Sequence, residues 1–122
     1  MKKRVLIVDD HPQMVESMCK SFSEHKFLEI CGHAASGHEA LEKADALKPD
    51  LVILDLAIPD LNGLKTAKAI SEILPNVRII LFTLYAQNIK DSNMDTSGIS
   101  RIVSKNEPYT LVAHAEDVVR AL

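Results

Sequence analysis

The sequence predicts an α/β protein with a doubly wound, five-stranded parallel sheet and helices on both faces. Short apolar runs at 5–8, 51–54 and 77–82, the last interrupted only by Arg78, are typical of strands buried on both faces of a parallel sheet. Segments with apolar residues at helical spacing separate these runs. Strand and helix therefore alternate five times, which favours right-handed crossovers with helices on both faces.

The first half of the chain reads as strand, helix, strand, helix. After the first apolar run, Pro12 suits the first turn of a helix whose apolar spacing continues to Lys26. Residues 27–34 form a less regular apolar segment, which predicts a second strand near an edge of the sheet. Apolar residues spaced along 37–48 predict a second helix that ends before Pro49.

The second half continues from the central strand at 51–54. A turn at Asn62 and Gly63 precedes an amphipathic helix over 64–74, and the third apolar run follows it. Residues 85–97 are polar with few large aliphatic side chains. A helix there would be weakly held, so we expect this segment to be the most mobile part of the chain.

The chain closes with a predicted strand and helix. Residues 99–103 form a short last strand. Asn106 can cap a final helix that has Pro108 in its first turn and an apolar stripe reaching Leu122.

Composition limits the class of protein. The 122 residues suit one domain, 1–122, and the net charge of -3 without a basic patch argues against nucleic acid binding by this chain itself. Cys19 and Cys31 lack metal or redox spacing, so we interpret both as small core residues in a reducing compartment. The sequence contains no signal peptide and no run of membrane-spanning length, so we expect a cytoplasmic protein that does not bind a membrane.

Polar side chains stand where the predicted strands end: Asp9, Asp10, Asp55, Thr83 and Lys105. The carboxyl ends of parallel strands meet at one crevice, so these side chains should converge there. Clustered carboxylates favour a hard cation such as Mg²⁺. A metal, an ammonium and a hydroxyl around one carboxylate suit phosphoryl transfer to that carboxylate, with Asp55 as the nucleophile.

The sequence resembles a response-regulator receiver domain along essentially its whole length, and its motifs are similar to the NarL/LuxR-type subfamily. The motifs are Asp9-Asp10-His11-Pro12, Asp55 to Pro59 with Asn62-Gly63, Thr83, and Ser104-Lys105. The resemblance implies a flavodoxin-like, CheY-like fold and phosphorylation of Asp55 by a sensor histidine kinase. It also implies a conformational switch that controls transcription through a C-terminal helix-turn-helix domain, for which these residues leave no room, and a homodimer formed on phosphorylation.

The resemblance also assigns roles at the metal site. Asp10 and Asp55 would ligate Mg²⁺ directly, the carbonyl of Ala57 would supply a third oxygen, and Asp9 would act mostly through a coordinated water. The histidines are scattered over different elements, and we expect none of them to be a ligand. His11 should pack or cap at the helix entry instead.

By the same resemblance, Thr83 would hydrogen-bond the phosphoryl group and Lys105 would pair with one of its oxygens. Two positions depart from the family. Ile102 stands where an aromatic switch residue is common, and the bulky Leu84 follows Thr83 where a small residue is common. Leu84 either gates access to Asp55 or points into the core.

Two other functions compete with a phosphorylated receiver. An aspartyl-nucleophile phosphatase or phosphotransferase needs a second acid shortly after the nucleophile, and this chain has none before Asp60. A degenerate receiver acting only as a binding module is disfavoured because Asp10, Asp55, Thr83 and Lys105 are all present.

Overall fold

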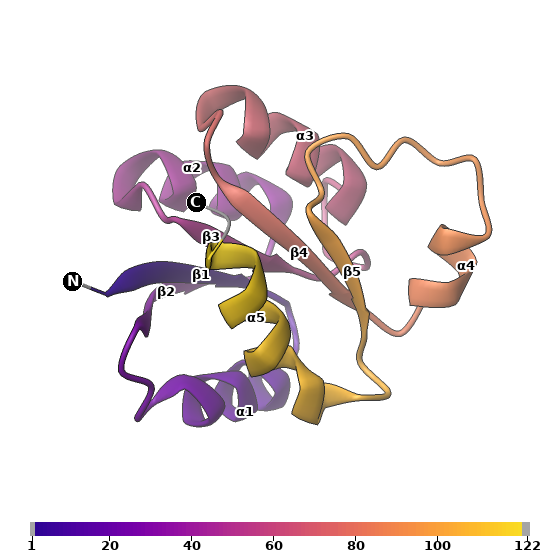
Figure 1. Cartoon of the computed structure of the whole chain (residues 1–122). Coiled ribbons are helices and arrows are strands. Elements are labelled where there is room, and N and C mark those ends of the chain that lie inside the picture. The colour runs from indigo at the N-terminus through magenta and orange to yellow at the C-terminus, as the bar shows by residue number, and fades with distance from the viewer. Residues whose placement is uncertain (1, 121–122) are drawn as a thin grey trace.

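The computed structural model describes residues 2–120 and shows strands and helices in alternation (Figure 1). The elements are β1 (Lys3–Val8), α1 (Pro12–Phe22), β2 (Leu28–Ala34), α2 (Gly37–Leu47), β3 (Leu51–Leu54), α3 (Gly63–Ile73), β4 (Arg78–Thr83), α4 (Ala86–Lys90), β5 (Arg101–Ser104), the 3-10 turn η1 (Pro108–Thr110) and α5 (Leu111–Arg120). None of these helices is long and apolar enough to cross a bilayer.

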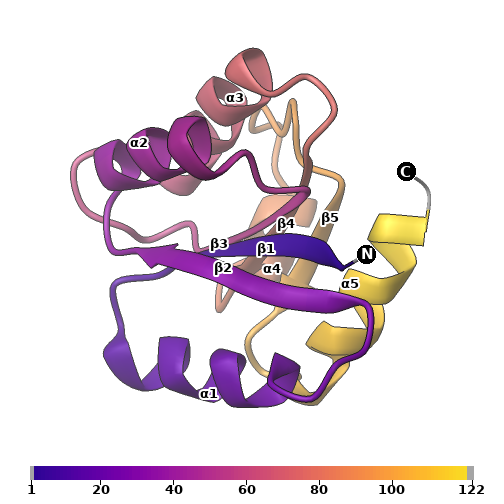
Figure 2. The same ribbon diagram turned by 90° about the vertical axis from the view of Figure 1, so that its left-hand side faces the viewer.

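The five strands form one parallel sheet in the order β2-β1-β3-β4-β5. Helices α2 and α3 cover one face, and α1 and α5 cover the other (Figures 1 and 2). The predicted fold class is therefore confirmed. β2 is an edge strand, as its irregular pattern predicted, and its pairing with β1 shifts register between Val5 and Leu6.

Two apolar cores sandwich the sheet because successive side chains of a strand point to opposite faces. In β1, Leu6 and Val8 join the core under α2 and α3, whereas Val5 and Ile7 join the core under α1 and α5. All four are fully buried. Burial on both faces explains why β1, β3 and β4 read as continuous apolar runs.

Three helical predictions need correction. The helix expected over 85–97 is only the five residues of α4, anchored by Ala86 and Ile89, and the polar remainder forms turns and irregular chain. The first helix ends at Phe22 rather than Lys26, since Ser23 and the following residues turn toward β2.

The entry to the last helix also differs from the prediction. Asn106 does not cap it: Pro108 starts the 3-10 turn η1, and α5 begins only at Leu111. The backbone amide of Asn106 instead donates to the Ser104 hydroxyl at 3.0 Å, which continues the turn after β5. Leu122 lies outside the described residues.

The two cysteines behave as the sequence predicted. Both are free thiols, half-buried, and each packs against a different core, Cys31 under α2 and α3 and Cys19 under α1 and α5. Burial raises the pKa of the Cys31 thiol.

Candidate functional site

Backbone hydrogen bonds between neighbouring strand ends fix the site at the carboxyl edge of the sheet. The amide of Asp9 donates to Ala34, that of Asp55 to Val8, and that of Lys105 to Thr83, each at 3.0 Å. Each of the three residues directly follows the last residue of its own strand, and its backbone amide still hydrogen-bonds to the neighbouring strand. This places the three side chains over the same end of the sheet.

Lys105 bridges two buried carboxylates. Its Nζ lies 2.6 Å from Asp9 Oδ2 and 2.9 Å from Asp55 Oδ2. The side chains of Lys105, Asp9 and Asp55 are only 6%, 1% and 5% exposed. Burial by itself lowers the pKa of Lys105, but the hydrogen bonds and charges of the two carboxylates outweigh it and hold the pKa above its ordinary value.

His11 completes the cluster at the carboxylate oxygen of Asp9 that Lys105 does not contact. Its backbone N–H donates to Asp9 Oδ1 at 2.9 Å, and its ring Nδ1 lies 2.9 Å from Asp9 Oδ1 and 3.1 Å from Asp10 Oδ1. His11 occupies the N-cap position of α1, as predicted, but its ring makes no capping hydrogen bond to the helix. Pro12 restrains His11 to an extended backbone, which turns its side chain back to the acidic pair.

The acidic cluster has the donors and spacing of a metal site. Asp9, Asp10, His11 and Asp55 each offer one ligand atom, and these atoms lie within 4.8 Å of one another. Mg²⁺ prefers carboxylate, carbonyl and water oxygens, so the three carboxylates fit it. The sequence grouped the carboxylates correctly but missed His11, although its position next to Asp10 and before Pro12 was the available signal.

The loop after β3 brings Ala57 to the cluster. The Ala57 amide points at Asp55 Oδ1, 3.4 Å away, and the Gly63 amide donates to the Leu56 carbonyl at 2.8 Å. A Cβ at Gly63 would lie 2.4 Å from the Asp55 carbonyl oxygen, so only glycine lets α3 begin so close to the end of β3. Asn62 caps α3 by accepting from the Lys65 amide at 3.0 Å.

Asp60 holds the outer part of the same loop. Its Oδ1 accepts from the Gly37 amide at 3.0 Å, and its Oδ2 lies 2.7 Å from His38 Nδ1, which ties the loop to the start of α2. The hydrogen bond to His38 lowers the pKa of the exposed Asp60 carboxyl. Asp60 thus has a structural contact of its own, away from Asp55.

Leu84 lies at the mouth of the site. It is 60% exposed, so the prediction that it might point into the core is wrong. Together with the half-exposed Tyr85, it borders a hollow of about 240 Å³. The hollow is lined by Asp10, His11, Asp55, Ala57, Leu84, Tyr85 and Lys105.

Two predicted switch residues lie outside this hollow. Thr83 is fully buried, and its hydroxyl accepts from the Tyr85 amide at 3.2 Å. Ile102 packs half-buried against the core under α2 and α3, and it lines a separate hollow beside Lys90 and His114. Both would have to move to act on Asp55.

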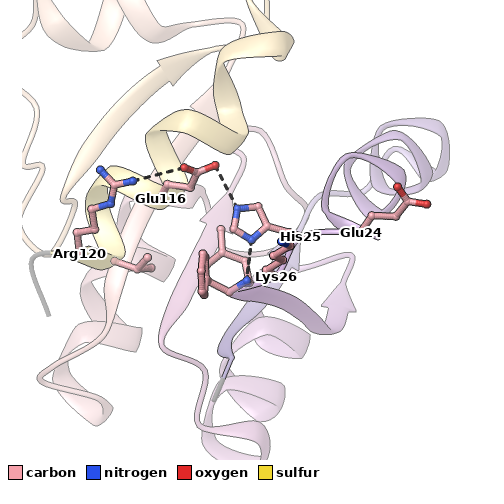
Figure 3. A pocket seen from close by; sticks show the side chains of 8 residues that line it. Glu24, His25, Lys26, Glu116 and Arg120 are labelled. Atoms are coloured by element: carbon pink, nitrogen blue, oxygen red, sulfur yellow. Dashed lines mark hydrogen bonds and ion pairs between the residues drawn. The ribbon is translucent and has the colours of Figure 1, made fainter.

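A larger hollow, of about 450 Å³, lies at the opposite, amino end of the sheet (Figure 3). His25 Nδ1 accepts from the amides of Phe27 and Leu28 at 3.0 and 3.1 Å, so its Nε2 is the nitrogen that donates to Glu116, 3.1 Å away. Arg120 flanks Glu116 on the other side at 3.8 Å. These contacts tie the turn before β2 to α5, so the residues around this hollow have a structural role. The acidic cluster of the described residues lies at the other end of the sheet.

A parallel five-stranded sheet whose carboxyl edge holds an acidic cluster and a buried lysine defines a receiver-type signalling domain. The chain belongs to the response regulator receiver domain family, whose model matches residues 5–116. It is a receiver domain of a two-component response regulator.

Similar proteins agree with this assignment. The response regulator protein VraR of Staphylococcus saprophyticus is 30% identical over 115 residues, which are 94% of this chain and 55% of VraR. The chain thus spans about half the length of this relative.

Solved structures give the same fold. A LuxR-family two-component response regulator from Aurantimonas sp. SI85-9A1 is 26% identical with a TM-score of 0.85, over 99% of this chain and 87% of that one. The response regulator TrrA of Thermotoga maritima, solved with Mg²⁺ and BeF, is 31% identical with a TM-score of 0.83, over 98% and 99% of the two chains. The expected likeness to the NarL/LuxR type is confirmed.

Proposed function

We propose that Asp55 accepts a phosphoryl group from the phosphohistidine of a sensor histidine kinase. The observation that carries the proposal is the contact of Lys105 Nζ with both Asp55 and Asp9 beside a hollow that reaches Asp55. A buried ammonium next to a carboxylate that lines a hollow can offset the charge that gathers on phosphoryl oxygens. Asp55 supplies the nucleophile.

In the reaction, a carboxylate oxygen of Asp55 forms a bond to phosphorus while the phosphorus–nitrogen bond of the donor breaks, and the bonding pair returns to the imidazole nitrogen. Lys105 pairs with a phosphoryl oxygen, and Thr83 turns inward to hydrogen-bond another. Asp10, Asp55 and the Ala57 carbonyl would hold Mg²⁺, and Asp9 would act mostly through a coordinated water. When bound, Mg²⁺ offsets negative charge on the carboxylates and on the phosphoryl group.

The domain's own residues also govern loss of the phosphoryl group by hydrolysis. Leu84 stands beside Asp55 at the mouth of the hollow, where its exposed side chain limits the approach of a donor or of water. Ile102 takes the place of an aromatic switch residue in the response to phosphorylation.

The same proposal sets the biological context. Phosphorylation changes the conformation of the domain, promotes a homodimer and controls an output, transcription through a C-terminal helix-turn-helix domain. This domain itself binds neither nucleic acid nor membrane, consistent with its net charge of -3. Its partner kinase presents phosphohistidine in the cytoplasm.

The competing phosphatase function is less well supported. Ala57 occupies the second position after the nucleophile, where such an enzyme needs an acid, and the side chain of Asp60 contacts α2 instead. A purely binding role does not explain a lysine buried between two carboxylates, because burying three charged groups costs free energy without stabilising an interface.

Intact mass after incubation with Mg²⁺ and acetyl phosphate tests the proposal. The wild type should gain one phosphoryl group, and Asp55→Asn should gain none. Asp91→Asn, an exposed carboxylate after α4, is the matched control and should be labelled like the wild type. Labelling of Asp55→Asn, or labelling of the wild type that a chelator does not reduce, would overturn it.

A further inference from the structure

We infer that His11 is a metal ligand in this site and sets its preference among divalent cations. The inference rests on the proposed function, since it concerns the same cluster, but it assigns a new donor and a new selectivity. With carboxylate and carbonyl oxygens alone the site would suit Mg²⁺. With His11 Nδ1 added, it favours Co²⁺ and similar borderline cations over Mg²⁺.

The first argument concerns hydrogen-bond donors and acceptors. His11 Nδ1 lies 2.9 Å from Asp9 Oδ1 and 3.1 Å from Asp10 Oδ1. Carboxylate oxygens cannot donate, so either a proton on Nδ1 or a cation must lie among these three atoms. A metal can replace that proton, which leaves the neutral ring protonated on Nε2.

The second argument is distance. In an octahedral site with bonds of 2.0–2.1 Å, neighbouring ligand atoms lie about 2.9 Å apart. The 3.1 Å separation of His11 Nδ1 from Asp10 Oδ1 is therefore close to one edge of such a coordination shell, with Asp9 Oδ1 beside it at 2.9 Å from Nδ1. Asp55 contributes its ligand atom within the same 4.8 Å cluster.

The third argument is that the chain fixes the His11 backbone but leaves its ring free to adjust. The His11 amide is bonded to Asp9 Oδ1, and Pro12 restrains the backbone before α1. The His11 side chain is 63% exposed, so its second nitrogen can stay hydrated while Nδ1 binds the metal. Lys105 lies on the other carboxylate oxygen of Asp9 and does not compete for this position.

His38 provides the matched control. Its Nδ1 lies 2.7 Å from Asp60 Oδ2, and it is as exposed as His11, but it faces this one carboxylate outside the acidic cluster. An amide replacement keeps a hydrogen-bond donor while removing a good nitrogen ligand. His11→Asn and His38→Asn therefore compare the same chemical change inside and outside the site.

The test is titration calorimetry of the untagged chain with Mg²⁺ and with Co²⁺. The ratio of Co²⁺ to Mg²⁺ affinity should fall at least about tenfold in His11→Asn, the scale of losing a metal-supporting group, and should not change in His38→Asn. Proton NMR of the Co²⁺ form should show a strongly shifted imidazole N–H signal that His11→Asn lacks.

The outcomes separate the inference from the proposed function. An unchanged affinity ratio in His11→Asn, with no shifted imidazole signal in the wild type, overturns the role of His11. If Asp10→Asn still abolishes Mg²⁺ binding in that case, the phosphoacceptor site stands without it. Loss of the shifted signal in His38→Asn instead of His11→Asn would equally overturn the inference.

Discussion

Replacing Lys105 by methionine should destabilise the metal-free domain strongly. The change keeps an unbranched side chain but removes the cation between Asp9 and Asp55, whose side chains are 1% and 5% exposed. Breaking a buried ion pair from one side costs about 3–5 kcal/mol, because a charge is left buried without its partner. For a chain of 122 residues, at about 4 °C per kcal/mol, the melting temperature should fall by about 12–20 °C.

Calorimetry with and without Mg²⁺ measures this effect and its cause. Mg²⁺ should raise the melting temperature of Lys105→Met more than that of the wild type, because in the variant only the metal can offset the charges of Asp9 and Asp55. Lys20→Met removes an exposed ion pair with Glu16 and should change stability by no more than about 0.5 kcal/mol. A loss below about 1 kcal/mol in Lys105→Met, or equal Mg²⁺ effects in both proteins, would refute the reasoning.

Three further results are expected. The pKa of Lys105 is raised above its ordinary value of 10.5, so its stabilising contribution is complete below that pH and is lost as the pH rises through the folded-state pKa. Above about pH 10.5, the free energy of unfolding should therefore fall more steeply with pH in the wild type than in Lys105→Met. Leu84→Ala should cost about 1 kcal/mol or less, since Leu84 is 60% exposed, yet shorten the phosphoryl lifetime of Asp55; a lower melting temperature with an unchanged lifetime would remove the gating role. Hydrogen exchange on phosphorylation should change over 84–103, where α4 has only Ala86 and Ile89 buried, and changes confined to α1 and α2 would contradict this.

The sequence predicted most of the fold because the strands are buried on both faces. Continuous apolar runs identify β1, β3 and β4, and regular apolar spacing identifies α2 and α3. The errors fall where burial is weak. In α4 a polar segment forms a single short helix, and before α5 Pro108 produces a 3-10 turn in place of the expected cap at Asn106.

The candidate site divides in the same way. Asp9, Asp55 and Lys105 could be grouped from sequence because each follows a strand end, and strand order then determines that they meet. The contact of His11 with both carboxylates depends on a backbone turn that composition does not specify. Thr83, the last residue of β4, is fully buried with its hydroxyl accepting from the Tyr85 amide, and periodicity cannot predict this contact either.

The backbone bonds that join Asp9, Asp55 and Lys105 to their neighbouring strands have an evolutionary consequence. They fix the positions of the reactive groups through the sheet, whereas the surrounding helices and loops form the surfaces available to other molecules (Figure 2). Mutations can therefore alter which molecules the domain recognises without disturbing the positions of its reactive atoms. A gene duplicated from this one could diverge into a separate signalling route while inheriting its chemistry unchanged.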